Sequence, residues 1–278
     1  MPVGVTGSTG RLGGRIARLL ASAGAEQRLV VRDPRRAPDL RGTTVAQAEY
    51  ADTDAVRRAL DGLETVLMVS ASESADRLDG HRSFVDAAAD AGVRRLVYVS
   101  FFGAAPAATF TLARDHYATE QHIERAGMAW TFLRDNLYAD FFPMMAGADG
   151  VIRGPAGDGR VAAVGQDDIA AAAVAVLLEP EAHARTTYDL TGPEALGLDE
   201  VAATMTRVLG RPHAFRDETV EEAYASRASY GAPGWQVDAW VSTYTAIAAG
   251  ELSGVTGDVQ RLTGRSATPL AEVLTRRG

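Results

Sequence analysis

Three glycines spaced three residues apart, Gly7, Gly10 and Gly13, lie between a short apolar run and a helical pattern. The run Val3–Thr6 is predicted to be a strand, and Arg11–Ala23 a helix with its large apolar residues on one face. Gly7 allows a tight turn, Gly10 lets the backbone approach a pyrophosphate, and Gly13 lets the helix pack closely on the strand. The N–H groups of the helix N-terminus then face the phosphates. The loop predicts a dinucleotide site; its alternative is a tight turn without a ligand.

Strand-like runs and helical patterns alternate over the first half of the chain. The predicted strands are Val3–Thr6, Arg28–Arg32, Thr65–Val69, Arg95–Ser100 and Ala129–Arg134, and the predicted helices are Arg11–Ala23, Thr53–Asp61, Arg77–Ala91 and Leu112–Ala126. This alternation indicates an α/β fold with a doubly wound parallel sheet, whose strands all end on one edge. We predict a dinucleotide-binding domain over 1–150, to which segments near 165–192 return, and a smaller α/β C-terminal domain over 151–278.

The composition removes several kinds of chemistry. All 28 basic residues are arginines, which excludes a lysine Schiff base, a phosphate-loop lysine and a Tyr-Lys pair. The chain has no cysteine, which excludes disulfides, thiolate zinc sites and cysteine nucleophiles. Its five histidines show no metal-ligand spacing, so we expect no metal site. A net charge of −8 argues against nucleic acid as a partner.

The end of the second predicted strand distinguishes the two nicotinamide dinucleotides. An acidic residue there would bind a ribose 2′-hydroxyl and favour NAD. Arg32 holds this position, 19 residues after Gly13, and is followed by Asp33. A guanidinium can bind a 2′-phosphate through two hydrogen bonds, and Arg11 can approach from the glycine loop. We therefore predict NADP(H) as the cofactor. The alternatives are a solvated basic turn, or a turn shifted by one residue in which Asp33 serves a ribose.

Several segments resemble one family, the NmrA-like branch of atypical short-chain dehydrogenase/reductases. The resemblance is carried by TGSTGRLG, VRDP, YVSFFGA and HYATEQHIERAGMAWTFLRDNLYADFF, and it extends to residues 157–177 and 262–274. Within this branch the chain is most similar to type 2 NAD(P)H:quinone oxidoreductases. The resemblance implies a Rossmann domain with NADPH across the carboxyl edge of its sheet. It also implies a small C-terminal domain that closes a cleft over the nicotinamide.

The same resemblance implies where cofactor and substrate are contacted. Residues 70–72 would line the inner ribose, and Ser100 would lie near the nicotinamide. With the glycine loop, the candidate cofactor-binding residues are Thr6, Gly7, Thr9, Gly10, Arg11, Leu12, Gly13, Arg32, Ser70, Ala71, Ser72 and Ser100. The candidate substrate-facing residues are Phe102, Asn136 and Tyr138.

The chain departs from the Tyr-x-x-x-Lys pair of typical short-chain dehydrogenases, because Tyr117 is followed by Gln121. Related reductases of the branch often carry Lys where this chain has His116. A histidine there can donate a proton near neutral pH, and Glu120 lies one helical turn away. His116 and Tyr117 are therefore the candidate catalytic residues. The alternative for His116 is an ordinary surface histidine beside a carboxylate.

The missing Tyr-Lys pair favours an acceptor that needs little acid catalysis. Hydride addition to a quinone gives a hydroquinone monoanion, a far weaker base than the alkoxide made from a simple ketone. We predict a flavin-independent, NADPH-dependent oxidoreductase that transfers hydride to a quinone-like or conjugated carbonyl acceptor. The alternative function is a non-catalytic regulatory protein that senses NADP(H).

The remaining expectations concern location and partners. No basic and apolar targeting run precedes Arg11, and the longest apolar stretch, Ile169–Leu178, has ten residues, too few to cross a bilayer. We expect a cytoplasmic protein with no membrane or nucleic-acid partner. It would bind a small quinone or enone-like substrate as a monomer or homodimer.

Overall fold

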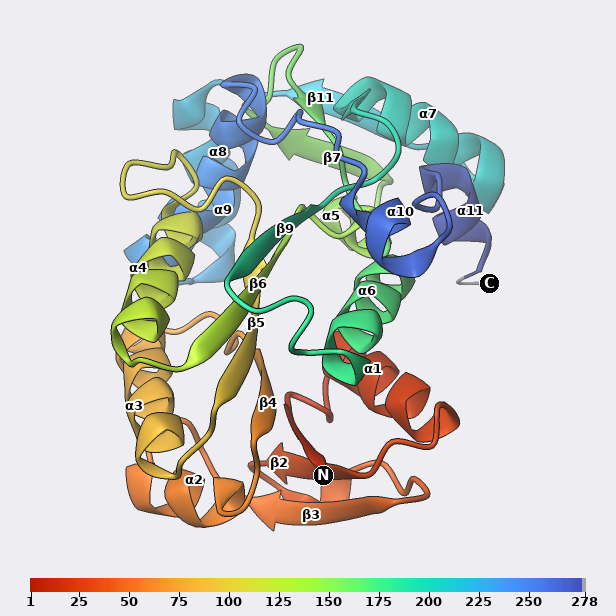
Figure 1. Ribbon diagram of the computed structural model, residues 1–278. Coiled ribbons are helices and arrows are strands. Elements are labelled where there is room, and N and C mark those ends of the chain that lie inside the picture. The colour runs from red at the N-terminus through yellow and green to blue at the C-terminus, as the bar shows by residue number, and fades with distance from the viewer. Residues whose placement is uncertain (277–278) are drawn as a thin grey trace. The chain divides into compact units, whose positions relative to one another are not determined.

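The computed structural model describes residues 1–276 and contains a seven-stranded sheet in the order β3-β2-β1-β4-β5-β6-β9 (Figure 1). Its strands are β1 (Val3–Thr6), β2 (Gln27–Val31), β3 (Thr43–Gln47), β4 (Thr65–Val69), β5 (Arg95–Phe101), β6 (Ala129–Asp135) and β9 (Thr186–Leu190). Parallel pairing joins β3 to β2, β2 to β1, β1 to β4 and β4 to β5. The chain moves outward from β1 to β3 and then returns to β4 on the other side of β1. Doubly wound sheets bind ligands at such a reversal, beyond the carboxyl ends of the strands.

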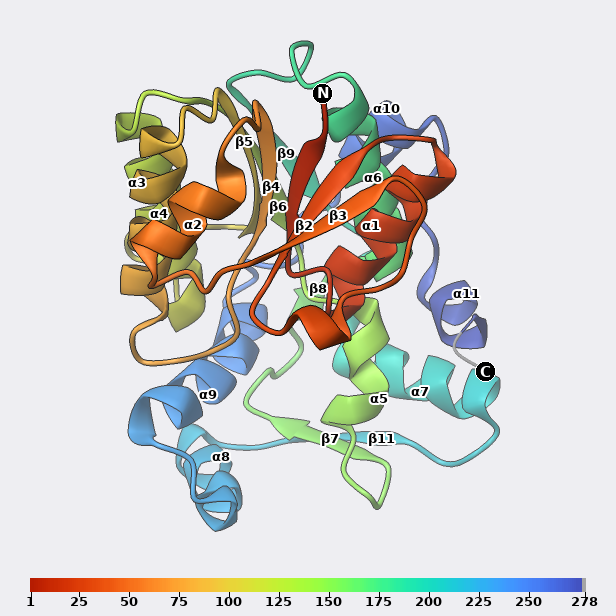
Figure 2. The ribbon, with the colours of Figure 1, turned by 90° about the horizontal axis from the view of Figure 1, so that it is seen from below.

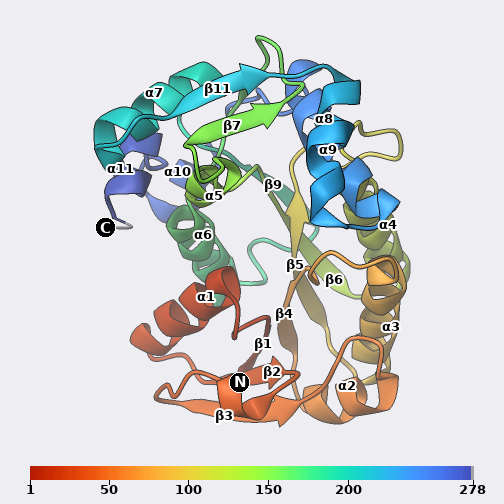
Figure 3. The same cartoon turned by 180° about the vertical axis from the view of Figure 1, so that it is seen from behind.

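Helices cover both faces of the sheet. They are α1 (Arg11–Ser22), α2 (Thr53–Leu60), α3 (Arg77–Asp90), α4 (Thr111–Arg125) and α6 (Gln166–Leu178), and the short 3-10 helix η1 (Pro34–Arg36) follows β2. Figures 1 and 3 show α1 and α6 on one face, and α2, α3 and α4 on the other. The predicted Rossmann-type fold is confirmed, and the bounds of β1, α1, β4 and β5 lie within one residue of those predicted.

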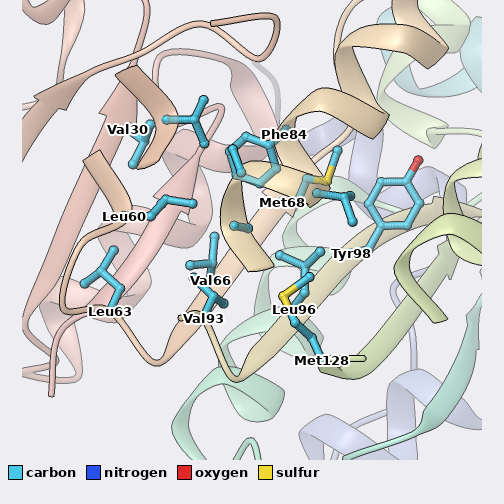
Figure 4. Close-up of a cluster of buried hydrophobic side chains, with 14 of the residues drawn as sticks. Val30, Leu60, Leu63, Val66, Met68, Phe84, Val93, Leu96, Tyr98 and Met128 are labelled. Carbon is cyan, nitrogen blue, oxygen red and sulfur yellow. The ribbon is translucent and has the colours of Figure 1, made fainter. Parts of the chain in front are cut away.

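The apolar core under α2 and α3 explains why the central strands carry unbroken apolar runs. Val66 and Met68 of β4 and Leu96 of β5 are buried against Leu60 of α2 and Phe84 of α3 (Figure 4). The first four residues of β4 are all buried, on both faces of the sheet. A strand covered on both faces has no solvent side, so its sequence shows no polar alternation.

β3 has no counterpart among the predicted strands. It forms the edge of the sheet beside β2, as Figure 2 shows, and its Val45 is 45% exposed. An edge strand that buries little apolar surface carries no apolar run, so hydrophobic periodicity does not mark it.

The chain divides into two compact units. The first is formed by Met1–Phe101, Asp115–Arg134 and Ile169–Tyr188, and the second by Phe102–Arg114, Asp135–Asp168 and the chain from Asp189 onward. The predicted boundary near residue 150 differs from this division, because the segments that follow β5 and β6 pack with the second unit. The helix α6 from Ile169 and most of β9 belong to the first unit.

The second unit contains two short two-stranded pairings. In the first, β7 (Val151–Gly154) pairs in parallel with β11 (Ala214–Asp217), as Figure 3 shows; in the other, β8 (Arg160–Val161) is antiparallel to β10 (Leu196–Gly197). Its helices are η2 (Ala139–Phe141), α5 (Phe142–Met145), α7 (Leu198–Leu209), α8 (Val220–Arg227), η3 (Ala228–Tyr230), α9 (Gly234–Ala248), α10 (Asp258–Thr263) and α11 (Leu270–Thr275). Over residues 1–276, no helix combines the length and the apolar character that crossing a bilayer requires.

Candidate active site

The glycine loop between β1 and α1 has the backbone geometry that a bound pyrophosphate needs. Gly7 adopts a φ of 66°, a left-handed conformation that favours glycine, and its carbonyl accepts a hydrogen bond of 2.9 Å from the Gly10 N–H. A Cβ added at Gly13 would lie 2.3 Å from the Gly7 oxygen, which is backbone and cannot yield cheaply. Gly13 therefore sets how closely α1 approaches β1.

The N-terminus of α1 has no side-chain cap from its N-cap residue. Gly10 is the N-cap residue and has no side chain, so it makes no side-chain cap to the first turn of α1. The Ser8 hydroxyl oxygen is buried and has no hydrogen-bond partner within residues 1–276. A buried polar atom of this kind calls for a partner that protein does not supply. Both observations fit the phosphates of a dinucleotide.

Thr6, the last residue of β1, forms hydrogen bonds at the base of the glycine loop. The Val69 N–H donates to Thr6 Oγ1 at 2.9 Å, and the Tyr50 hydroxyl donates to the Val69 carbonyl at 2.6 Å. Because the single Tyr50 proton is used there, Thr6 Oγ1 donates to Tyr50 Oη at 2.5 Å. This closed cycle ties the carboxyl ends of β1 and β4 together. The predicted cofactor contact of Thr6 stays a prediction, as do those of Thr9, Arg11 and Leu12.

Arg32 follows β2 at the same edge of the sheet. Its side chain is exposed, and no hydrogen bond or ion pair to that side chain is found in the described part of the chain. Its neighbour Asp33 is engaged by Arg35, with Arg35 Nε 2.9 Å from Oδ1 and Nη2 3.1 Å from Oδ2. The hydrogen bond from Arg35 lowers the pKa of Asp33 and keeps the carboxylate charged. The group that would bind a ribose in the shifted-turn alternative is thus already paired, whereas Arg32 is available to an anion.

The loop after β4 is held by its backbone. The Ala71 N–H donates to His81 Nε2 at 2.9 Å, and the Ala71 carbonyl accepts from Arg77 Nε at 3.0 Å. Both polar groups of Ala71 are therefore used inside the first unit. The predicted cofactor contacts of this loop remain predictions, and hydrogen bonds would have to come from Ser70, which is half-buried, or from the exposed Ser72.

His116 is buried in a polar network rather than exposed. Arg77 Nη2 lies 2.8 Å from His116 Nε2, and because a guanidinium only donates, Nε2 accepts. The ring proton is then on Nδ1, which lies 2.9 Å from the hydroxyl oxygen of Tyr98. Burial, with the charge of Arg77, lowers the pKa of His116 well below its usual value. The proton-donor role of His116 stays a prediction, and this geometry does not favour it, because the ring is neutral and both nitrogens are engaged.

Glu120 does not pair with His116. Its Oε1 accepts from the Ser100 hydroxyl at 2.6 Å and from Arg134 Nε at 2.9 Å, and its Oε2 accepts from Arg134 Nη2 at 2.6 Å. Ser100 is predicted to contact the cofactor. Because its hydroxyl proton is donated to Glu120, its oxygen could only accept a hydrogen bond from the cofactor. Tyr117, the other candidate acid, is half-buried on α4.

The predicted substrate-facing residues lie in the second unit. The Phe102 N–H donates to the Asp135 carbonyl at 2.9 Å, which brings the chain after β5 against the last residue of β6. Asn136 is buried, donates from Nδ2 to the Leu252 carbonyl at 3.0 Å and accepts from the Leu137 N–H at 2.8 Å. The Asn136 amide therefore holds the chain after β6 to the segment at Leu252. Its predicted contact with substrate stays a prediction.

Tyr138 is paired with a carboxyl group that the sequence did not single out. Its hydroxyl donates to Asp135 Oδ2 at 2.8 Å, and its ring meets that of Phe141 edge-on at 5.1 Å. Asp135 is only 3% exposed, and burial raises its pKa well above the usual value. This carboxyl therefore resists ionisation.

Sequence reasoning missed three buried residues that contact the candidate residues. Arg77 and Tyr98 contact His116 in the first unit, and Asp135 contacts Tyr138 in the second. No local pattern separates Arg77 from a solvated helical arginine. The one usable signal for Asp135 is its position, since a carboxyl at the end of a buried strand falls on the ligand-binding edge.

A cavity of about 500 Å³ lies elsewhere in the first unit. It is lined by Val3, Thr65 and Arg95, the first residues of β1, β4 and β5. Because it lies at the amino ends of the strands, opposite the glycine loop, it is not the dinucleotide site.

Comparison with known proteins agrees with this geometry. A family model described as NAD(P)H-binding matches residues 7–180. The chain is 32% identical to quinone oxidoreductase 2 of Escherichia coli over 277 residues, which cover 97% of this chain and 96% of that protein. It is 35% identical over 274 residues to a (4-alkanoyl-5-oxo-2,5-dihydrofuran-3-yl)methyl phosphate reductase of Streptomyces griseus, with 96% and 95% covered.

Solved structures give the same result. The crystal structure of an NADPH-dependent quinone oxidoreductase from Escherichia coli, complexed with NADPH, has a TM-score of 0.90 at 30% identity and covers 99% of both chains. The negative transcriptional regulator NmrA has a TM-score of 0.76 at 16% identity, with 99% of this chain and 94% of that one covered. The second likeness shows a shared fold alone.

Proposed function

The chain belongs to the NAD(P)H-binding family, and from that membership we propose that it is an oxidoreductase using NADPH to reduce quinone-like or other conjugated carbonyl acceptors. The relatives support this choice, because one is named a quinone oxidoreductase and another reduces a furanone. Both names describe electron-poor conjugated rings. No flavin is needed if the acceptor receives hydride directly.

The residues of the first unit support cofactor binding. When bound, NADPH supplies a hydride from its nicotinamide ring. The glycine loop and the N-terminus of α1 would hold the pyrophosphate, and Arg32 would hold the 2′-phosphate. The single observation that carries the proposal is the pairing of Asp33 with Arg35 beside an Arg32 that has no partner in the described chain. The carboxylate that would bind a ribose in the shifted-turn alternative is paired with Arg35, and a cation that can bind a phosphate lies beside it.

The acid groups of the chain favour an acceptor whose reduced form is a weak base. A simple ketone yields an alkoxide, which requires a strong, well-placed proton donor. This chain has no Lys, and His116 is neutral and engaged by Arg77 and Tyr98. A quinone yields a hydroquinone anion that a modest acid can protonate, so positioning of the acceptor supplies most of the rate.

The experiment that tests the proposal measures NADPH oxidation by the purified protein without added flavin. Benzoquinone is the acceptor, and cyclohexanone, an unconjugated ketone, is the matched control. We expect oxidation that depends on benzoquinone and none above background with cyclohexanone. The variant Gly10→Ala, which places a methyl group where the backbone meets the phosphates, serves as the control for a functioning cofactor loop.

Two results would contradict the proposal. Tight NADPH binding without oxidation by quinones or enones would favour the alternative, a regulatory protein that senses NADP(H). Equal rates with benzoquinone and cyclohexanone would remove the argument from the missing proton donor.

A further inference from the structure

We infer that Asp135 and Tyr138 form a proton relay, in which Tyr138 protonates the reduced acceptor and Asp135 replaces the proton. This inference rests on the proposed reductase function and extends it by naming the acid. Tyr138 is the catalytic residue, because its hydroxyl would touch the acceptor. Asp135 acts through Tyr138 and is a positioning residue and proton reservoir.

Asp135 and Tyr138 lie at the carboxyl end of a strand of the central sheet. Asp135 is the last residue of β6, and its carbonyl accepts the N–H of Phe102, which follows β5. The pair therefore belongs to the carboxyl ends of two strands, the edge at which doubly wound sheets bind ligands. The strand β6 that Asp135 ends belongs to the same sheet as β1.

The pair is also rigid. The backbone of Tyr138 forms a bridge with Val164, and the Ala139 N–H donates to the Val164 carbonyl at 3.0 Å. The Tyr138 ring packs edge-on against Phe141. The hydroxyl is thus held 2.8 Å from Asp135 Oδ2, while the tyrosine as a whole is only half-buried. Asp135 is therefore shielded from solvent, whereas Tyr138 is partly accessible.

Within residues 1–276, no cation forms an ion pair with Asp135. The charged groups on the neighbouring segments are Arg134, which pairs with Glu120, and the carboxyl groups of Asp140, Asp189 and Glu251. Asp140 accepts from the Gln166 N–H. Glu251 binds Thr109. A buried carboxyl without a cation favours its neutral form, and a carboxyl kept neutral near pH 7 can donate a hydrogen bond.

The relay has a balanced proton count. Before the acceptor binds, the Tyr138 hydroxyl donates to Asp135 Oδ2. After hydride addition the acceptor oxygen is an anion, and the Tyr138 hydroxyl turns from Asp135 to the acceptor and gives it this proton. The O–H bond of Asp135 breaks, and its proton moves across the 2.8 Å contact to Tyr138 Oη. Tyr138 is restored, the product gains one O–H bond, and Asp135 is left as a carboxylate that regains a proton from water.

A role that only stabilised the fold would need no ionisable group. An asparagine at position 135 would occupy the same volume and still bond Tyr138. It would avoid the cost of burying a carboxyl group. The choice of a carboxyl group therefore indicates a proton that moves.

The first measurement requires neither cofactor nor substrate. Infrared difference spectra of wild type against Asp135→Asn should show, at neutral pH, the carbonyl band of one protonated carboxylic acid that the variant lacks. In Tyr138→Phe this band should persist to higher pH, because the hydrogen bond from Tyr138 lowers the pKa of Asp135. Absence of the band from the wild type at neutral pH would overturn the relay.

The second measurement is the pH profile of kcat with benzoquinone. We expect the wild-type kcat to fall on the alkaline side, as Asp135 loses its proton. Asp135→Asn and Tyr138→Phe should both be slower by roughly 100-fold, the lower end of general acid catalysis, and should lack this alkaline limb. The dissociation constant of NADPH should stay within about twofold of wild type, since neither side chain is assigned to cofactor binding.

Matched controls are Asp39→Asn and Tyr230→Phe, which alter exposed residues and should keep the wild-type profile. Wild-type turnover with unchanged pH profiles in both test variants would overturn the relay and leave the proposed function intact. Absence of any wild-type turnover would overturn both, and the infrared band would then mark only a buried acid.

Discussion

Arg32 and Asp33 show how two adjacent residues decide which dinucleotide is favoured. Asp33 accepts two hydrogen bonds from the Arg35 guanidinium. It also accepts one of 3.1 Å from the Arg35 N–H, as the N-cap residue of η1. The hydrogen bonds of this carboxylate therefore stabilise the turn that follows β2. Arg32 keeps its charge at the edge of the sheet, with its carbonyl held by Gln47 Nε2 at 3.0 Å.

Replacing Arg32 tests this division of roles. We expect Arg32→Ala to weaken NADPH binding by about 1.5–3 kcal/mol, or roughly tenfold to hundredfold, because a charge-assisted pair with the 2′-phosphate is lost. NADH binding should change little. Fluorescence titration of both dinucleotides gives the comparison, with the exposed neighbour Arg36→Ala as control. Equal losses for NADPH and NADH would remove the 2′-phosphate assignment.

Residues were predictable where their role follows from local backbone geometry. The glycine loop is of this kind, since strand, loop and helix follow one another in the chain and Gly7 has the positive φ that its place requires. The network of Arg77, His116 and Tyr98 is not, because its members come from α3, α4 and β5 and meet only in the folded protein. His116 was predicted beside Glu120 from helical spacing alone, but Glu120 is held by Ser100 and Arg134.

At the scale of elements, α1 is placed by the space at Gly13. A Cβ at Gly13 would meet the Gly7 oxygen at 2.3 Å, whereas one at Gly10 would lie 3.2 Å from the same atom. The first contact forces the helix off the strand. The second requires a shift of a few tenths of an ångström, but it places a methyl group where the phosphates approach.

The two substitutions should therefore separate folding from binding. Gly13→Ala is expected to lower the free energy of unfolding by about 1–3 kcal/mol through overpacking, and to abolish NADPH binding with it. Gly10→Ala should lose NADPH binding at a smaller cost in stability. Urea unfolding and NADPH titration of both variants check this. A Gly13→Ala protein as stable as wild type would show that α1 tolerates a displacement.

Elements were predictable in proportion to the apolar surface they bury. β1 and β4 match their predicted bounds because both are covered on two faces and carry unbroken apolar runs. β3 was missed because its edge position leaves all five of its residues half-buried or exposed. The division of the chain into two units was harder to predict from the sequence than the strands were. The segments 102–114 and 135–168 join the second unit through long-range contacts, which no local pattern reports.

For the whole molecule, buried histidines link stability to pH. Burial, with the nearby charge of Arg77, lowers the pKa of His81 to about 3. Above pH 6.5 His81 is neutral in both folded and unfolded states. Below it only the unfolded chain takes up the proton, so the free energy of unfolding falls as the pH is lowered from 6.5 towards 3.

This linkage predicts a slope of about 1.4 kcal/mol per pH unit from His81 between pH ~6 and ~4. His81→Gln should be less stable at neutral pH, because the ring accepts from Ala71 and contacts Thr119, but its stability should depend less on pH by this slope. The carboxyl groups titrate in both proteins. The difference between the two slopes of unfolding free energy against pH therefore gives the contribution of His81 alone. Parallel slopes in urea unfolding would contradict the assignment.

The function proposed for this chain is NADPH-dependent reduction, and a comparison of the two dinucleotides tests it. The kcat/KM of the wild-type protein with benzoquinone should be measured with NADPH and with NADH, without flavin. We expect turnover with both dinucleotides and a preference for NADPH of at least about tenfold, the lower end expected for one charge-assisted phosphate contact. NADPH binding without turnover, or equal kcat/KM for the two dinucleotides, would contradict it.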